Sequence, residues 1–364
     1  MAADLKELVA RLKAKPAPAA GPDYAGGLST GSTLLNLACS GRPDVGFLPG
    51  HVYLLVGDSS SGKTFLSLTC FAEACRNRHY DDYRLVYDNA EDGALMDWDK
   101  YFGRKAALRV QPPRGNRVLP EYSATVEQFY DNLNDAMSDS PVLYVLDSMD
   151  ALSSTAEAKA VGKQRLARRK GGKESGSYGD GKAKANSSLL RLAHNKVVET
   201  GSILIIVMQT RDNIGLDAMF NPKVRAGGRA PTFYATLELW SSVKGLIRKP
   251  YKGKNLPVGI TSKVQVKKNR LTGRNRSVEF PIYYDTGIDD VGGMVRYLLD
   301  WEFWKKGKGG IIQTPEDVNF AGTEEDLIRY VEENNLEKLL RKHAAAAWRE
   351  AEAALAVERK PRYK

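Results

Sequence analysis

The sequence predicts an α/β fold with a mostly parallel central sheet and helices on both faces of that sheet. Three apolar runs read as buried strands, Val52 to Val56, Val142 to Leu146 and Ser202 to Met208. Their near-continuous apolar character is typical of strands covered on both faces. Each run ends in polar residues, and amphipathic segments lie between them. This alternation favours strands joined by helices over an all-α or all-β protein.

Composition sets the broad class. The chain has 364 residues, of which 42% are hydrophobic and 27% charged, as in ordinary globular proteins. We expect neither a signal peptide nor a membrane segment, because no apolar run approaches the ~20 residues that span a bilayer. Cys39, Cys70 and Cys75 form no metal or disulfide pattern, so a cytoplasmic location in a bacterial cell is expected. The net charge of +10 favours a polyanionic partner.

Composition changes along the chain predict three parts. Residues 1–27 hold a short amphipathic helix and a Pro/Ala/Gly-rich linker. They read as an arm that docks on a neighbouring subunit, the alternative being a frayed terminal helix. Residues 28–288 form the core. Residues 289–364 are expected to form a small C-terminal α/β domain with helices over Glu324 to Glu333 and Leu336 to Glu358.

The first strand runs into a glycine-rich loop with the pattern G-x-x-x-x-G-K-T. The loop consists of Gly57, Asp58, Ser59, Ser60, Ser61, Gly62, Lys63 and Thr64. Small residues let successive N–H groups curl around phosphate oxygens, and a helix N-terminus adds positive potential. Lys63 would reach the β and γ phosphates and Thr64 would bind Mg²⁺. A chance match in a Gly/Ser-rich connector is the alternative, but the strand-loop-helix context favours a nucleotide site.

Acidic residues follow two further strands. The strand Arg84 to Tyr87 ends in a stretch from Asp88 to Asp92, and Asp147 follows Leu146 directly. Ligands of open α/β sheets bind at the carboxyl ends of the strands. Asp147 therefore reads as a second Mg²⁺-holding carboxylate, and a solvated turn is the alternative at both places.

Elements between Ser123 and Thr200 alternate between helix and loop. Ser123 to Met137 reads as an amphipathic helix capped by Ser123 or Thr125. Ala156 to Lys184 carries nine basic and three acidic residues and is expected to be a mobile loop. Ala185 to Thr200 reads as a helix with Leu189, Leu190, Ala193, Val197 and Val198 inward. Lys184 and Arg191 should share its outer face, either solvated or facing whatever the loop touches.

The segment Asp212 to Arg229 is expected to be irregular, because it contains Asn221-Pro222 and Gly227-Gly228. It keeps Met219 and Phe220 among basic residues, which suits single-stranded nucleic acid, although a hydrophobic loop tucked onto the core is the alternative. Strands are predicted at Ala235 to Trp240, Thr261 to Lys268 and Val278 to Tyr284. Arg248 to Arg276 carries ten Lys or Arg and no acid, which favours contact with phosphates over a solvated face.

The order and spacing of these motifs resemble those of RecA-type recombinases, and of a bacteriophage-encoded member of that family in particular. The resemblance covers Leu28 to Ile288. Its parts are Ser29-Thr30-Gly31-Ser32, the phosphate loop, LDSMDAL at 146–152, Gln209, Gly227-Gly228 before Phe233-Tyr234-Ala235, and Val266-Lys267-Lys268-Asn269-Arg270. It implies ATP and Mg²⁺ as cofactors and single-stranded and homologous duplex DNA as partners. A head-to-tail helical filament is also implied, with single-strand-binding and mediator proteins as further partners.

The resemblance also implies roles for particular residues. Glu91 would activate the attacking water, and Gln209 would sense the γ-phosphate and move a DNA loop. Trp98 stands where the family stacks a tyrosine on adenine. Lys268 and Arg270 would reach ATP on the adjacent subunit. The residues expected at DNA are Arg165, Arg168, Arg169, Lys184, Arg191, Arg211, Phe220, Gly227 and Gly228.

Departures from the family pattern leave alternatives open. One extra residue precedes Glu91, so Asp92 is a second candidate for the catalytic carboxylate. The loop predicted at Ala156 to Lys184 is longer and more basic than the first DNA loop of the family, Arg270 replaces a lysine, and the tail is basic rather than acidic. The resemblance predicts a DNA-dependent ATPase that pairs homologous DNA and exchanges strands. A ring-forming helicase and a non-catalytic recombination mediator are the rival interpretations.

Overall fold

The structure, a computed structural model, describes residues 21–160, 180–213, 223–225, 230–360 and 362. The predicted helix of the N-terminal arm lies outside these residues. Among the described helices, none combines the length and the apolar character that crossing a bilayer requires.

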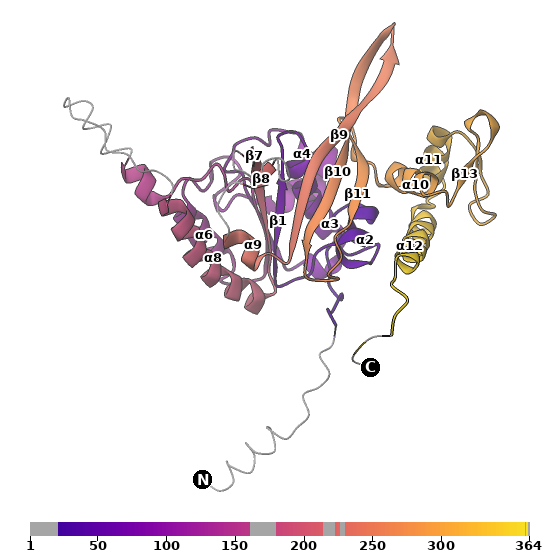
Figure 1. Ribbon diagram of the computed structural model, residues 1–364. Coiled ribbons are helices and arrows are strands. Elements are labelled where there is room, and N and C mark those ends of the chain that lie inside the picture. Colours follow the sequence, from indigo (N-terminus) through magenta and orange to yellow (C-terminus); the bar gives the residue numbers. More distant parts are fainter. Residues whose placement is uncertain (1–20, 161–179, 214–222, 226–229, 361, 363–364) are drawn as a thin grey trace.

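A ten-stranded sheet forms the centre of the molecule (Figure 1), with the order β12-β11-β10-β9-β1-β7-β6-β2-β3 and β8 paired to β7. The parallel part comprises β1 (His51–Gly57), β2 (Arg84–Asp88), β3 (Val110–Gln111), β6 (Val142–Leu146) and β7 (Ile203–Asp212). β9 (Leu237–Tyr251) continues parallel to β1, and β10 (Lys254–Asn269), β11 (Ser277–Tyr283) and β12 (Gly287–Ile288) follow antiparallel.

Helices cover both faces of the sheet, as Figure 1 shows. One face packs on α2 (Thr33–Ser40), α3 (Lys63–Arg76), α4 (Trp98–Phe102) and α5 (Arg104–Arg109). The other packs on α6 (Val126–Ala136), α8 (Asp180–Thr200) and the short α9 (Ala230–Tyr234). The side chains of β1 point alternately to the two faces of the sheet. Tyr53 and Leu55 pack in the core on the α3 face, whereas Val52, Leu54 and Val56 pack in the core on the α8 face. The predicted fold class is confirmed.

The hairpin of β9 and β10 extends well beyond the rest of the sheet (Figure 1). Its two strands turn at Lys252 and Gly253, which both have positive φ, 46° and 75°, as a tight hairpin turn requires. We call residues 243–258 the basic arm. The predicted strands Ala235 to Trp240 and Thr261 to Lys268 are present within β9 and β10, but both strands are longer than predicted, because the arm is exposed and lacks the apolar run that indicates a buried strand.

The C-terminal part packs against α2 and β11. Its elements are α10 (Asp290–Asp300), β13 (Lys305–Lys306), β14 (Ile312–Gln313), β15 (Ala321–Gly322), α11 (Glu324–Glu333) and α12 (Glu337–Ala354). The half-buried Asp290 accepts hydrogen bonds from the backbone N–H and the hydroxyl of Thr33, at 2.6 and 2.7 Å, which ties α10 to α2. The remaining elements are η1 (Arg78–Tyr80), β4 (Arg114–Gly115), β5 (Pro120–Glu121) and η2 (Lys308–Gly310).

Several local predictions need correction. Residues 155–160 are helical and α8 begins at Asp180, so both ends of the predicted loop Ala156 to Lys184 are helical. A reciprocal pair of hydrogen bonds between Ser154 and Glu157 caps the first of these helices. Lys223–Arg225 forms β8 on the end of β7, within the segment predicted to be irregular. Val198 is 50% exposed rather than inward.

Candidate functional site

The phosphate loop lies at the carboxyl end of β1 and leads into α3. Gly62 adopts φ 92° immediately before the helix, a conformation that favours glycine. Gly57 lies against β9, since a Cβ atom there would come within 2.3 Å of the Ser241 carbonyl oxygen. The hydroxyl groups of Ser61 and Ser241 form a hydrogen bond of 2.7 Å. The loop therefore packs against the neighbouring strand β9 as well as leading into α3.

The two side chains expected at phosphate and metal each form a hydrogen bond, Lys63 within the loop and Thr64 with Asp147 outside it. Lys63 is 8% exposed and its Nζ donates to the backbone oxygen of Asp58 at 2.6 Å. Burial lowers the pKa of Lys63, while the nearby carboxylates, Asp147 first among them, oppose that shift. The Thr64 hydroxyl donates to Oδ2 of Asp147 at 2.7 Å.

Asp147 is 3% exposed at the end of β6. Burial raises the pKa of its carboxyl group, and the hydrogen bond from Thr64 partly offsets this. A buried carboxylate next to a hydroxyl supplies the oxygen ligands that Mg²⁺ prefers, and a cation would also offset the cost of burying the charge. Thr64 and Asp147 thus fit the metal that the loop implies.

Glu91 and Gln209 lie together beside the loop. Nε2 of Gln209 donates to Oε1 of Glu91 at 2.6 Å, and the Gln209 backbone N–H donates to Oδ2 of Asp150 at 2.6 Å. Glu91 follows β2, whereas Gln209 lies in β7, so the contact spans two strands of the sheet. Asp92 adopts φ 52° and is exposed. The geometry places Glu91, among the two candidate carboxylates, in contact with Gln209.

Trp98 is half-buried and packs against Phe71, Tyr87 and Phe102. It also lines a cavity of about 310 Å³ together with Asn89. The ring is therefore held by the core on one side and faces a cavity on the other, at the sheet edge where β2 ends.

Lys268 and Arg270 lie beside the amino end of β9, away from the part of that strand that contacts the phosphate loop. Lys268 pairs in register with Glu238 near the start of β9, whereas Gly57 pairs with Ser241 further along that strand. Lys268 donates to the backbone oxygen of Thr232, and Arg270 donates to that of Phe233 at 2.7 Å. Both side chains are therefore directed to the backbone of α9 and not to the phosphate loop of their own chain.

Most of the predicted DNA contacts fall outside what the structure describes. Arg165, Arg168, Arg169, Phe220, Gly227 and Gly228 lie in undescribed segments, and of Lys184 only the helical backbone is described. Arg191 on α8 and Arg211 on β7 are exposed. Arg211 follows Gln209 by two residues, so it lies at the base of the β7–β8 hairpin.

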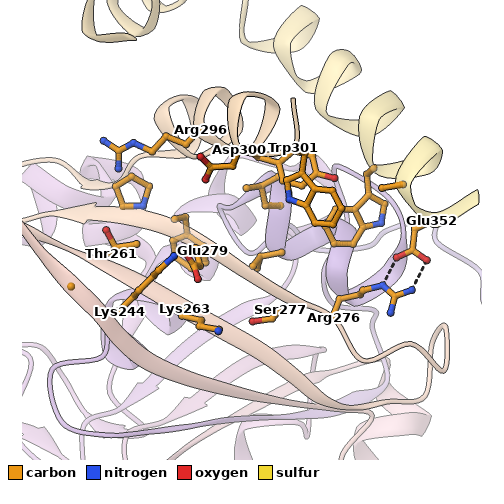
Figure 2. Close-up of a pocket in the computed structure, with 18 of the residues that line it drawn as sticks. Lys244, Thr261, Lys263, Arg276, Ser277, Glu279, Arg296, Asp300, Trp301 and Glu352 are labelled. Carbon is orange, nitrogen blue, oxygen red and sulfur yellow. Dashed lines mark hydrogen bonds and ion pairs between the residues drawn. The ribbon is translucent and has the colours of Figure 1, made fainter. Parts of the chain in front are cut away.

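A cavity of about 720 Å³ lies between β10, β11 and the C-terminal helices (Figure 2). Trp301 and Trp348 line it, and Arg276 reaches across to Glu352 of α12, Nη2 lying 2.9 Å from Oε2. No residue of the phosphate loop contributes to this cavity. It is therefore separate from the nucleotide site.

Sequence reasoning missed several groups at the site. The Tyr87 hydroxyl donates to Asp147 at 3.3 Å, Asp150 fixes the Gln209 backbone, and Lys223 lies 2.9 Å from Asp58. Asp150 could have been proposed from the sequence, because it stands three residues after Asp147, just beyond the end of the same strand. Lys223 carried no such signal, because its partner is 165 residues away in the chain.

The strand-loop-helix unit, with a carboxylate from β6 beside its threonine, defines a phosphate-loop protein of the α/β class. The sequence matches the model of the RecA N-terminal domain over residues 23–289. It is similar to Protein RecA of Bartonella bacilliformis, with 30% identity over 276 residues, 74% of this chain and 68% of the relative. The chain belongs to the RecA family.

Two further relatives extend the similarity. Protein RecA of Clostridioides difficile is 26% identical over 317 residues, 84% of this chain and 78% of that protein. Protein RecA of Deinococcus radiodurans is 28% identical over 335 residues, 90% of this chain and 81% of that protein. These relatives are bacterial, so the bacteriophage origin stays a prediction.

Proposed function

We propose that the chain is a recombinase that uses ATP and Mg²⁺ to polymerise on single-stranded DNA, pairs it with homologous duplex and exchanges strands. The observation that carries the proposal is the contact of Glu91 with Gln209. It joins a candidate catalytic carboxylate to the strand that leads into the β7–β8 hairpin. Membership of the RecA family supports the same activity.

Each part of the proposed ATPase has a candidate residue. Backbone groups of the loop and Lys63 would bind the phosphates, and Thr64 and Asp147 would hold Mg²⁺, which neutralises charge on the phosphates when bound. Glu91 would accept the proton of the attacking water. Trp98 would stack on the adenine from its cavity.

The position of Lys268 and Arg270 supports head-to-tail assembly. Their distance from the loop of their own chain suits cations that act on the nucleotide of an adjacent subunit, where they would stabilise transition-state charge. Such a heterologous interface generates either a filament or a closed ring. Residues 1–27 would serve as the arm that links one subunit to the next.

Two basic surfaces are proposed to contact DNA. One is the loop predicted at Ala156 to Lys184, and the other is the basic arm, which carries Lys244, Arg248, Lys249, Lys252 and Lys254 and no acidic residue. These arm side chains are exposed. Lys244 pairs with Glu279 of β11, so the other exposed cations of the arm are the ones that suit sequence-independent contact with phosphates. Arg191 and Arg211 would add to the surface on the core.

The nucleotide site is tested by Lys63→Ala. Losing the buried cation should weaken ATP binding about 10- to 100-fold and abolish nucleotide-dependent filaments. Lys338→Ala removes an exposed charge on α12 and serves as the control. Undiminished ATP affinity in Lys63→Ala would exclude the assigned site. Electron microscopy with DNA and ATP distinguishes the recombinase from a ring-forming helicase, since helical filaments are expected and closed rings are not.

A further inference from the structure

The carboxylate of Asp58 links the phosphate loop to the β7–β8 hairpin. Its Oδ1 accepts hydrogen bonds from the Thr210 hydroxyl and from Nζ of Lys223, the latter at 2.9 Å. Thr210 directly follows Gln209 in β7, and Lys223 begins β8. Lys223 also lies 3.5 Å from Asp212, its register partner on β7. The loop and the hairpin are thus joined at a point separate from the contact of Glu91 with Gln209.

Asp58 also holds the lysine of the loop. Its backbone oxygen accepts from Nζ of Lys63 at 2.6 Å and from the Ser61 hydroxyl at 2.8 Å. Lys63 is the cation that nucleotide phosphates would take. One residue therefore contacts both the group that would bind the phosphates and the hairpin whose strand β8 lies within the segment Asp212 to Arg229.

The charge of Asp58 matters because the loop is built to hold an anion. The hydrogen bonds from Thr210 and Lys223 lower the pKa of Asp58, so its carboxylate is ionised near neutral pH. An uncompensated negative charge in the loop would repel a triphosphate. Lys223 compensates it only while the β7–β8 hairpin stays in its present position.

We propose that the Asp58–Lys223 ion pair couples nucleotide binding at the phosphate loop to the position of the β7–β8 hairpin. The inference rests on the proposed function, in which the phosphate loop binds ATP and Arg211, at the base of the β7–β8 hairpin, belongs to the DNA surface. Asp58 and Lys223 are positioning residues in this account. Because coupling is reciprocal, a DNA that holds the hairpin in place should raise nucleotide affinity by the same factor by which nucleotide raises DNA affinity.

A double-mutant cycle tests the coupling in the full chain. A non-hydrolysable imido analogue of ATP, with Mg²⁺, is titrated with and without a single-stranded oligothymidine, using Asp58→Asn, Lys223→Gln and the double variant. Lys223→Gln should weaken binding of the analogue about two- to fivefold, the range expected of a partly exposed ion pair. In the Asp58→Asn background the same change should have almost no effect. Thr210→Val, which removes the second donor, should weaken binding in the same direction.

The control is Lys338→Gln, which removes an exposed charge on α12 and should leave the affinity for the analogue unchanged. In Asp58→Asn the gain in affinity for the analogue on adding DNA should shrink. Equal effects of Lys223→Gln in both backgrounds would overturn the coupling while leaving the proposed function intact. If the wild-type chain binds neither ATP nor the analogue, the proposed function fails and the coupling falls with it.

Discussion

Nε2 of Gln209 lies 2.6 Å from Oε1 of Glu91, which joins the ends of two strands that are not neighbours in the sheet. β6 lies between β2 and β7 and supplies Asp147 at the same edge. Three residues predicted separately from the sequence therefore meet beside the phosphate loop. This meeting point supports the proposal that Glu91, Asp147 and Gln209 act together in one ATPase site.

Glu91→Gln should retain ATP binding and lose hydrolysis about 100-fold or more, because an amide cannot accept the proton of the attacking water. The amide oxygen can still accept the hydrogen bond from Gln209. Steady-state ATP hydrolysis with single-stranded DNA provides the measurement. Asp92→Asn is the matched control and should hydrolyse ATP normally. If Asp92→Asn is the inactive variant, the catalytic carboxylate has been misassigned.

Mixing two inactive variants should restore hydrolysis if Lys268 and Arg270 act on a neighbouring subunit. Glu91→Gln lacks the proposed base, and the double variant Lys268→Ala/Arg270→Ala lacks the proposed cations. In an equal mixture about one quarter of head-to-tail interfaces would combine an intact base with intact cations. ATPase activity of the mixture is compared with each variant alone. No recovery at any mixing ratio would contradict the role between subunits.

Removing charge from the predicted loop at Ala156 to Lys184 should change the salt dependence of DNA binding. Each phosphate neutralised on single-stranded DNA contributes about 0.7 to the slope of log affinity against log salt. Replacing Arg165, Arg168, Arg169 and Lys170 by alanine should therefore lower the slope by up to about 3 if all four contact phosphate. ATPase without DNA should be nearly unchanged. Unaltered slopes on both single- and double-stranded DNA would mean that the loop faces solvent.

The basic arm permits a matched comparison with the same number of charges. Replacing Arg248, Lys249, Lys252 and Lys254 by alanine should also lower the slope of log affinity against log salt. The expected decrease is up to about 3 on single-stranded DNA or about 4 on duplex. The four side chains are exposed on a two-stranded hairpin, so the fold should tolerate the change. Thermal unfolding checks this tolerance. If the variant keeps the wild-type slope on both single-stranded and duplex DNA, the arm does not contact DNA.

The contact of Arg276 with Glu352 should make stability depend on pH. The hydrogen bond from Arg276 lowers the pKa of Glu352 below its usual value of 4.5. A lowered folded-state pKa stabilises the protein above the unfolded pKa, and this contribution is lost as the pH falls below about 4.5 through the folded-state value. Glu352→Gln should cost about 1–2 kcal/mol at pH 7 and less at pH 3. Denaturant unfolding at both pH values measures this, and an equal cost at both would contradict it.

The sequence predicted the site better than the periphery. Gly57 to Thr64, Asp147 and Gln209 could be placed because each stands at the end of an apolar strand, which fixes its position in a parallel sheet. The basic arm could not, because exposed strands lack an apolar run and its Lys252–Gly253 turn is a weak signal. The link from Asp58 to Lys223 depends on tertiary contacts that no local pattern encodes.

Homologous strand exchange tests the central proposal most directly. The wild-type chain is incubated with ATP, Mg²⁺, circular single-stranded DNA and homologous linear duplex, and the DNA products are separated by electrophoresis. We expect joint molecules and exchanged circular duplex with the homologous duplex and none with an unrelated duplex. Absence of exchanged product from a chain that binds single-stranded DNA and hydrolyses ATP would contradict the account and favour a helicase or a mediator.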